Sequence, residues 1–411
     1  MNAKSKIDQL RAEINKHNHA YYVLNSSTLT DAEFDEMYRQ LVDLETDNPD
    51  LIEPSSPTQR IGAESKSGFK KVAHSDQRML SLDNMRSAAD LIKYFGEVEV
   101  VLEPKIDGAS LKLIYADGNL VQAITRGNGS EGDDVTANAR AIKSIPLVLT
   151  ESIDIVVTGE VYMTFSMFNA LNSRLEAEEE ELMANPRNAA AGAIKLKNPN
   201  NVASRRLSFV AYGTTTEFAD VRTQVELTDI LEHLGFRSVR LLPVNTMAEV
   251  TLSECVTIDD EASLVELVKM ADIKRKYLDL PTDGLVFKLN DLAAQRELGE
   301  GTKYPNYACA YKFPPEVKET LLIGITIQVG RTGRITPVAE LQPVLLGGTI
   351  VRRASLCNQA QINRLMITPG CTVLVEKSAE IIPAVVKVHE KIYFNPKNKQ
   401  QGTLRQHGVL A

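Results

Sequence analysis

The stretch Glu103-Pro104-Lys105-Ile106-Asp107-Gly108-Ala109-Ser110 lies between two apolar segments, residues 98–102 and residues 111–115. This pattern predicts a strand, a tight corner and a second strand. The corner presents Lys105 at the mouth of a sheet, where an amine whose neighbours keep it neutral can act as a nucleophile. The pattern Lys-x-Asp-Gly is common, however, and on its own it favours a surface lysine before a turn.

Length and composition exclude several classes of protein. A chain of 411 residues predicts two to four domains, and 43% hydrophobic residues are enough for packed cores. Apolar runs are all shorter than the roughly 20 residues of a membrane helix, and the charged residues 1–16 are unlike a secretory signal. The four cysteines form no Cys-x-x-Cys pair, which favours a reducing compartment and argues against a zinc site. We therefore expect a cytoplasmic protein with no membrane partner and no zinc.

The distribution of charge separates the C-terminal part from the rest. The net charge is −8, yet residues 316–411 contain twelve Lys or Arg and six Asp or Glu. A basic module on an acidic body is typical of a local phosphate-binding surface. Chance asymmetry accounts for the count equally well.

Residues 1–62 predict a helical hairpin. Thr30 to Glu33 has the form of a capping box at the start of the second helix. Aromatic rings and carboxylates gather where the helices meet, and such a group can bind a flat cation. They are Tyr21, Tyr22, Asp31, Phe34 and Asp35. A hairpin that packs its aromatic rings inward is the favoured alternative, and residues 54–68, rich in Pro, Ser and Gly, predict a linker.

The central part alternates helices and strands and carries two further lysines. Asp117-Gly118 predicts a β-hairpin, and a strand is expected over residues 153–163. Lys288 and Lys312 each lie in a short apolar strand, which predicts three lysines on three strands of one sheet. Because lysines repel one another, a shared anionic ligand is the natural reason to gather them. Helices are expected at about residues 88–95, 165–182, 223–234 and 261–276.

After residue 315 the chain changes to short strands separated by glycine turns, which predicts a small β-barrel. The expected strands cover residues 321–329, 334–342, 349–352 and 371–375.

Taken together, the motifs resemble those of the bacterial-type NAD-dependent DNA ligases over about residues 6–390, in the same order and at similar spacing. The motifs that carry the resemblance are Ser56–Arg60, Ser81–Asn84, Glu103–Gly108, Thr125–Gly127, Gly159–Val161, Ala184–Gly192, Asp283-Gly284 with Lys288, Tyr311–Phe313, Val329–Gly333 and Thr336–Ala339.

The resemblance implies an α+β multidomain fold. Its expected parts are a helical nicotinamide-mononucleotide-recognition domain (1–62), an ATP-grasp-like adenylation, or nucleotidyltransferase, domain (63–315), an OB-fold barrel (316–392) and a flexible tail (393–411). The family continues with zinc-finger, helix-hairpin-helix and BRCT modules. We expect a short form without these modules, either natural or truncated.

The resemblance also implies an activity: sealing of nicks in double-stranded DNA during replication and repair, with NAD as the donor of AMP. The expected products are nicotinamide mononucleotide (NMN) and AMP, and Mg²⁺ or Mn²⁺ is the expected metal, with ligands not assigned. A monomer that acts on the DNA of a bacterium, a virus or a phage is expected.

Site residues follow from the same resemblance. The catalytic set is Lys105, Asp107, Lys288 and Lys312. The set that binds the cofactor is Tyr21, Tyr22, Asp31, Phe34, Asp35, Ser81, Leu82, Glu103, Arg126, Glu160, Lys288 and Lys312. The set that contacts DNA is Arg187, Asn188, Arg331, Thr332 and Arg334.

The chain departs from the family pattern at several positions. Phe34 replaces a usual tyrosine, Thr158 and Lys195 replace usual arginines, and Cys357 replaces a usual histidine. Lys377-Ser378-Ala379-Glu380 stands where Arg-Ala-Gly-Asp is usual. Two alternatives remain open: an RNA ligase or capping-type nucleotidyltransferase, and a degenerate DNA-binding relative that adenylates but seals poorly.

Overall fold

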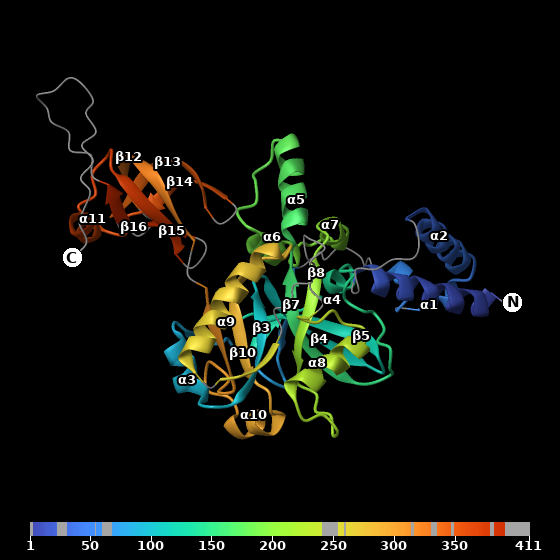
Figure 1. The fold of residues 1–411 in the computed structure, drawn as a ribbon. Helices are drawn as coiled ribbons and strands as arrows, with labels where there is room; N and C mark the ends of the chain where they lie inside the picture. The colour runs from blue at the N-terminus through green and yellow to red at the C-terminus, as the bar shows by residue number, and fades with distance from the viewer. Residues whose placement is uncertain are drawn as a thin grey trace, which may run out of the picture. The chain divides into compact units, whose positions relative to one another are not determined.

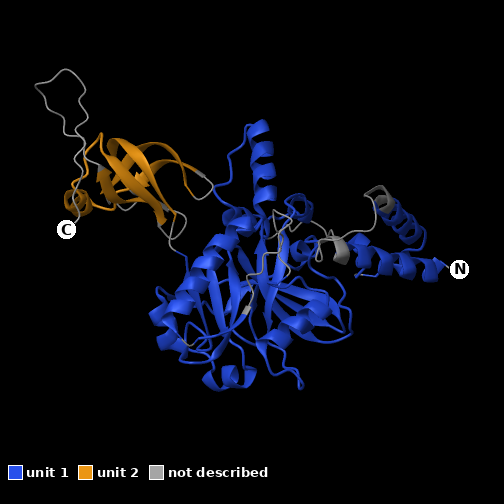
Figure 2. Cartoon of the chain, viewed as in Figure 1, with its two compact units in different colours: residues 1–313 blue, residues 314–411 orange. Residues whose placement is uncertain are grey.

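The computed structural model describes residues 3–22, 31–53, 55–59, 68–240, 254–258, 260–313, 316–329, 335–346, 349–378 and 382–390. The chain divides into two compact units, residues 1–313 and residues 314–411 (Figure 2). Figure 1 labels the helices and strands of both units. No helix in the described ranges combines the length and the apolar character that crossing a membrane requires.

The first unit begins with two packed helices, α1 (Ala3–Tyr22) and α2 (Asp31–Asp47). Ile7, Leu10 and Ile14 recur at helical spacing on α1 and bury one face of it against Leu41 of α2. This small apolar core confirms the predicted helical hairpin.

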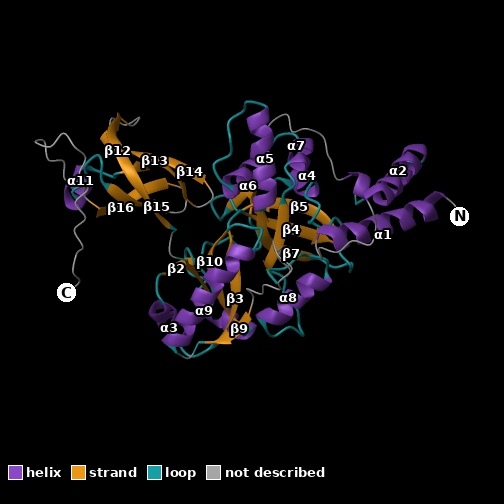
Figure 3. Cartoon of the chain, turned by 45° about the horizontal axis from the view of Figure 1, so that its top comes forward, coloured by secondary structure: helices purple, strands orange, loops and turns teal. Residues whose placement is uncertain are grey.

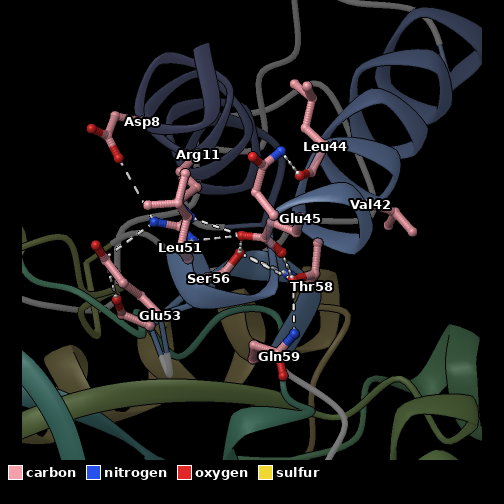
Figure 4. Close-up of polar contacts among 12 residues, drawn as sticks. Asp8, Arg11, Val42, Leu44, Glu45, Leu51, Glu53, Ser56, Thr58 and Gln59 are labelled. Atoms are coloured by element: carbon pink, nitrogen blue, oxygen red, sulfur yellow. Dashed lines mark hydrogen bonds and ion pairs between the residues drawn. The ribbon is translucent and has the colours of Figure 1, made fainter. Parts of the chain in front are cut away.

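A buried ion pair joins the two helices (Figure 4). The guanidinium of Arg11 donates from Nε and Nη2 to Oε1 of Glu45, at 2.9 and 2.7 Å. The two side chains are only 9% and 3% exposed. Ser56 donates to the same carboxylate over 2.7 Å, and the Thr58 hydroxyl donates to its other oxygen.

These contacts correct the predicted linker over residues 54–68. Pro57–Gln59 forms a short 3-10 helix, η2, after an equally short η1 at Pro49–Leu51. Because Ser56 and Thr58 satisfy the buried Glu45, residues 55–59 belong to the folded helical part. Pro54 and residues 60–67 lie outside the described residues.

A five-stranded sheet forms one half of the remaining part of the first unit, with strand order β2-β11-β10-β3-β9. Its strands are β2 (Asp83–Met85), β3 (Glu99–Ile106), β9 (Glu254–Thr257), β10 (Thr282–Leu289) and β11 (Ala308–Lys312). Helices α3 (Ala88–Phe95) and α9 (Glu261–Lys274) lie beside it in Figures 1 and 3. Val100, Leu102, Leu285 and Phe287 pack with these helices in one core.

A four-stranded sheet of order β5-β4-β7-β8 forms the other half. It comprises β4 (Ala109–Ala116), β5 (Asn119–Thr125), β7 (Ile155–Tyr162) and β8 (Ser208–Thr214), and β1 (Lys71–Ala73) pairs with β6 (Glu131–Asp133) nearby. The helices of this half are α4 (Thr136–Arg140), α5 (Phe165–Ala177), α6 (Pro186–Ala193), α7 (Pro199–Ser204) and α8 (Gln224–His233). The largest core, with Leu111, Leu113 and Tyr115, lies under this sheet.

Two turns predicted from the sequence organise the sheets. Asp117 and Gly118 have φ of 47° and 74°, the positive values that a two-residue type I′ hairpin requires, and they join β4 to β5 as predicted. At Asp107-Gly108 the chain passes from the five-stranded sheet to the four-stranded sheet. A Cβ at Gly108 would lie 2.2 Å from the carbonyl oxygen of Val161, so this crossing accepts no side chain.

Two predicted helices are shorter than expected. The helix expected over residues 165–182 ends at Ala177, within the acidic run that begins at Glu176. Successive carboxylates repel one another and are unfavourable at the negative C-terminal end of a helix. Helix α9 ends at Lys274, two residues before the expected end, and a 3-10 turn, η3 (Arg275–Tyr277), follows it. In the first unit, helices α4, α6, α7 and α10 (Leu292–Leu298) were not among the predicted helices.

The second unit is a closed barrel of strand order β12-β13-β14-β16-β15, which confirms the predicted OB-fold class. Its strands are β12 (Val317–Val329), β13 (Ile335–Leu346), β14 (Thr349–Ser355), β15 (Thr372–Ser378) and β16 (Ile382–Glu390). The sequence predicted four strands and missed β16, because Pro383 lies near its start. In the barrel Pro383 pairs with Lys377 of β15. Helix α11 (Gln359–Leu365) lies between β14 and β15 in the chain.

Candidate nucleotide site

A cavity of about 810 Å³ lies in the first unit and is lined by residues of both sheets. Pockets of about this size hold small-molecule ligands and cofactors. Ten of the residues predicted from the sequence line it. They are Ser81, Leu82, Glu103, Lys105, Asp107, Arg126, Glu160, Arg187, Lys288 and Lys312.

The three lysines lie on three strands of one sheet, as predicted, and these strands are neighbours in the five-stranded sheet. Gly284 of β10 pairs with Lys105 of β3 on one side and with Lys312 of β11 on the other. Lys288 is four residues further along β10, on the same face. Because side chains alternate along each strand, Val100 and Leu102 are buried in the core while Glu103 and Lys105 line the cavity.

Asp283 connects two of the lysines. Thr282 pairs with Ile106 and Gly284 with Lys105, so a β-bulge gives β10 one extra residue at Asp283. Its carboxylate accepts both hydrogen bonds of the Lys105 ammonium, at 2.8 and 2.7 Å, and lies 3.3 Å from Nζ of Lys312. The Asp283 side chain is 2% exposed, so the bulge fixes a buried anion beside the predicted nucleophile.

Lys288 is held away from the other two lysines. Its Nζ lies 2.7 Å from Oε2 of Glu103 and donates to the carbonyl oxygen of Tyr212 over 2.6 Å. The Tyr212 ring lies under the same ammonium, 5.6 Å from Nζ to the ring centroid. The other carboxylate oxygen of Glu103, Oε1, is buried and has no hydrogen-bond partner among the described residues.

The unpaired oxygen of Glu103 supports a ligand in this cavity. Buried polar atoms nearly always have a hydrogen-bond partner, and the exceptions call for an explanation. The Glu103 side chain is 3% exposed and lines the cavity. A ligand that carries a hydroxyl or an amino group would supply the missing donor, which an adenosine moiety can do.

Glu160 of β7 lies across the crossing from Lys105. The hydroxyl of Ser110 donates to its Oε2 over 2.9 Å. Burial raises the pKa of Glu160 to about 7, although Ser110 and the charge of Lys105 oppose this. Burial, followed by the nearby charge of Glu160, also raises the pKa of Tyr212. This side of the cavity therefore holds a carboxyl group that titrates near neutral pH.

Asp107, at the crossing itself, forms an ion pair with Arg187 of α6. Nη1 of Arg187 donates to Oδ1 of Asp107 over 2.8 Å. Burial raises the pKa of Asp107, and Arg187 partly offsets that shift. The structure thus brings Arg187, predicted as a DNA contact, into the cavity beside a predicted catalytic residue. Asn188, the next residue, is exposed, and its backbone N–H binds the side chain of Asn185, the N-cap of α6.

Arg126 opens the glycine-containing turn after β5. The turn contains Gly127 and Gly129, with φ of 56° and 91°, and the amide of Gly129 donates to the Arg126 carbonyl over 2.9 Å. The backbone amide of Met79 donates to the carbonyl oxygen of Gly129 over 3.0 Å. This bond joins the segment that carries Ser81 to the turn that carries Arg126, whose side chain is exposed, and the two segments meet at the cavity.

Two departures from the family pattern also lie at the cavity. Lys195 lines it, with Nζ 2.8 Å from a carboxylate oxygen of Asp133, and Thr158 lines it from β7. The hydrogen bond from Lys195, with a second from Lys71, lowers the pKa of Asp133. Lys195 is therefore positioned by its ion pair with Asp133 at the edge of the cavity.

Several predicted residues cannot be placed. The side chains of Tyr21, Tyr22, Asp31 and Asp35 lie outside the described part of the chain, as do Arg331, Thr332 and Arg334. Phe34 is described, and its ring packs against the small core of α1 and α2. For Phe34 the contacts favour the packing alternative, and the other residues remain predictions.

Sequence reasoning missed three residues that shape the cavity: Asp283, Ser110 and Tyr212. Asp283 lay inside a quoted motif, Asp283-Gly284, and a glycine beside an acidic residue in a strand is a signal for a bulge. Tyr212 and Ser110 had no comparable signal. Within the described residues no group of three or more His, Cys, Asp or Glu side chains is arranged to hold a metal ion.

The sheet with three lysines at a cavity, followed by a closed five-stranded barrel, defines a nucleotidyltransferase-type domain joined to an OB-fold. Comparison with protein families agrees. Residues 66–316 match the NAD-dependent DNA ligase adenylation domain, residues 319–395 the NAD-dependent DNA ligase OB-fold domain, and residues 1–62 the DNA ligase-like, N-terminal NAD⁺-binding domain. The chain belongs to the NAD-dependent DNA ligase family.

Relatives with known names are similar along nearly the whole chain. A DNA ligase of Thermotoga petrophila is 43% identical over 392 residues, which cover 93% of this chain and 55% of the relative. A DNA ligase of Bacteroides fragilis is 41% identical over 407 residues, which cover 96% of this chain and 59% of the relative. The chain therefore spans somewhat over half the length of these relatives.

A solved structure of a Lig E DNA ligase covers 76% of this chain at 12% identity with a TM-score of 0.40. A similarity of that size adds nothing to the assignment.

Proposed function

We propose that this chain is an NAD-dependent DNA ligase that seals nicks in double-stranded DNA through a lysyl-AMP intermediate. The observation that carries the proposal is the geometry around Lys105. Its amine lines a cavity, is oriented by both oxygens of the buried Asp283, and is flanked by Lys312 on the neighbouring strand. A nucleophilic lysine and a set of cations are what phosphoryl transfer needs.

In the first step Nζ of Lys105 attacks the phosphorus of the AMP half of NAD. The P–N bond forms, the bond to the oxygen of NMN breaks, and NMN leaves with that electron pair. The attacking amine must be neutral, and the proton that it loses on forming the bond can pass to a nearby carboxylate such as Asp283. Asp283 thus serves to orient the amine and to receive or share its proton.

Cationic side chains counter the charge that gathers on the phosphate. Lys312 is 41% exposed and lies at the level of Lys105, which suits it to a phosphate oxygen. Lys288 pairs with Glu103 deeper in the sheet, and an incoming phosphate competes with that carboxylate for it. Mg²⁺ suits this chemistry because phosphate oxygens and water complete its shell, so few protein ligands are needed.

The remaining cavity residues suit the adenosine half of NAD. Glu103 offers an unpaired buried oxygen, and Glu160 and Arg126 line the same space. The helical residues 1–62 match an NAD⁺-binding domain, which supports NAD as the donor of AMP. We assign recognition of the nicotinamide half to Tyr21, Tyr22, Asp31 and Asp35.

The later steps transfer AMP to a 5′-phosphate at the nick, and the adjacent 3′-hydroxyl then attacks and expels AMP. The OB-fold barrel is assigned to duplex DNA around the nick, with Arg331, Thr332 and Arg334 as phosphate contacts. Such contacts make affinity fall steeply with salt, and an affinity insensitive to salt between 50 and 200 mM would contradict this part.

The nucleophile is tested by incubating the chain with NAD labelled in its adenylate group. Lys105→Ala should carry no label, while Lys93→Ala, on the exposed face of α3, should be labelled like the parent. Label on Lys105→Ala sinks the assignment. Replacing NAD by ATP or GTP, and nicked DNA by nicked RNA, separates this function from an RNA ligase or capping-type enzyme.

The role of the helical domain is tested by deleting residues 1–60. We expect the shortened chain to lose reaction with NAD and to keep sealing of a nick that already carries 5′-adenylate. Loss of both activities would indicate that the domain stabilises the fold rather than recognising NAD.

A further inference from the structure

One buried lysine plays no part in the chemistry described above. Lys112 lies on β4, and its side chain is only 1% exposed. It pairs with Thr158 of β7, on the same face as Ser110 and Glu160, so it lies under the cavity-facing side of the four-stranded sheet. A buried ammonium is costly unless charge and hydrogen bonds compensate it.

The compensation comes from a segment without helix or strand. Nζ of Lys112 donates to Oδ1 of Asp76 and to the carbonyl oxygen of Gln77, each over 2.6 Å. The other oxygen of Asp76 accepts from the hydroxyl of Thr215 over 2.9 Å. Burial tends to raise the pKa of Asp76, but the hydrogen bond and charge of Lys112 outweigh it and lower the pKa.

Residues 76–82, here called the wall segment, carry one wall of the cavity. Every residue from Gln77 to Leu82 lines it, as does Thr215 at the turn after β8. Lys112 and Asp76 are absent from the described lining residues, so any effect they have on a ligand passes through their neighbours. One ion pair therefore anchors two separate parts of the cavity lining.

The wall segment spans from one sheet to the other. At its start it is fixed to the four-stranded sheet by Lys112. At its end the amide of Ser81 donates to the carbonyl of Lys303 over 3.3 Å, and Nη1 of Arg78 donates to the carbonyl of Thr302 over 3.3 Å. Residues 302 and 303 lie in the connection between α10 and β11 of the five-stranded sheet. A segment without regular structure relies on such anchors for its position.

We propose that Lys112 and Asp76 are positioning residues of the nucleotide cavity: the ion pair between the buried Lys112 ammonium and the partly exposed Asp76 carboxylate fixes the wall segment and the turn at Thr215, and thereby sets the affinity for NAD. This proposal rests on the proposed function, because it takes NAD as the ligand. Loss of the pair removes the anchor of Asp76 and Gln77 on the four-stranded sheet, while Met79 stays bonded to the carbonyl of Gly129 and the Gln77 side chain to Glu300. Binding must then order the start of the wall segment again. Binding is weakened, and the alignment of Lys105, which lies on the other sheet, is preserved.

The test measures NAD binding by calorimetry in the full chain with Lys105→Met as the common background, which prevents the covalent step. Lys112→Met and Asp76→Asn should each raise the dissociation constant about tenfold. The double variant should be no weaker than the weaker single variant, because both changes remove the same pair. Leu113→Val is the matched control. Leu113 follows Lys112 on β4 and points to the other face of the sheet, into the apolar core, so this substitution should leave the dissociation constant within twofold of the background.

A second readout separates positioning from general damage. With Lys105 intact, the KM for NAD should rise about tenfold and the kcat should change less than threefold. A merely structural role would lower the melting temperature or the kcat at an unchanged KM.

Dissociation constants within twofold of the background in both Lys112→Met and Asp76→Asn overturn the positioning proposal alone. If Lys112→Met fails to fold, the dissociation constant of Asp76→Asn alone is compared with that of the background, and a value within twofold overturns the positioning proposal. A background protein that binds neither NAD nor AMP overturns the proposed function, and the positioning proposal with it.

Discussion

Replacing Asp283 by asparagine removes the buried charge that orients the amine of Lys105 and changes almost no volume. The carboxylate accepts two hydrogen bonds from Nζ, at 2.8 and 2.7 Å, and asparagine offers one acceptor in their place. As the N–P bond forms, the attacking nitrogen becomes cationic before it loses its proton, and a hydrogen bond from that charged nitrogen to the carboxylate contributes about 2 kcal/mol in the transition state, which corresponds to a factor of about 30 in rate. The cavity also becomes more positive, so the anionic substrate should bind at least as tightly.

We therefore expect Asp283→Asn to slow formation of the protein adenylate about 30-fold at saturating NAD, with no increase in KM. The assay is a single-turnover time course of label transfer from NAD to protein. Asp279→Asn is the control. Asp279 lies four residues before Asp283 and accepts hydrogen bonds from Ser166 at the start of α5, so this substitution should leave the rate unchanged. A rate within threefold of the parent, or a loss that appears in KM, would refute orientation by Asp283.

Three further predictions concern stability and the crossing between the sheets. Burial raises the pKa of Glu160 from 4.5 to about 7. Between pH 4.5 and pH 7 the folded chain therefore binds more protons than the unfolded chain, and the free energy of unfolding should fall by about 3 kcal/mol as the pH rises through this range. Urea titrations from pH 4.5 to 8 should show this slope in the parent and lose it in Glu160→Gln. Glu45→Gln breaks the buried pair with Arg11 and should cost about 3–5 kcal/mol, seen as lost hydrogen-exchange protection in α1 and α2; unchanged protection would contradict it. Gly108→Ala places a Cβ 2.2 Å from a carbonyl oxygen of β7. The clash should displace the crossing at Asp107-Gly108, next to Lys105, and slow adenylation at least tenfold. A rate like that of the parent would show that this crossing can relax around the added methyl group.

The features that follow from local pattern were predictable. The corner between two apolar segments predicted Lys105 at the mouth of a sheet, and the apolar runs around Lys288 and Lys312 predicted three lysines on three strands of one sheet. That the three strands are adjacent follows from the pairing of β10 with β3 and β11. The Asp117-Gly118 hairpin followed from the positive φ that its turn type demands. The roles of the cavity residues remain predictions, because geometry places them without testing their chemistry.

Features that depend on partners distant in sequence were not predictable. The bulge at Asp283 depends on how β10 pairs with β3, and the ion pair of the buried Lys112 depends on a residue 36 positions away in the sequence. Residues 55–59 have the composition of a linker, yet Glu45 binds them. Strand β16 was missed because Pro383 argues against a strand, whereas the barrel accommodates it in a pair with Lys377.

A pulse and chase experiment follows AMP from NAD through Lys105 to the nick. The purified chain is incubated with adenylate-labelled NAD and Mg²⁺, then excess unlabelled NAD and a singly nicked duplex are added, and the label is followed on protein and DNA. We expect label on the protein through Lys105, followed by its loss from the protein as the nick is sealed and AMP is released. A protein that takes no label from NAD would rule out Lys105 as the acceptor of AMP from NAD.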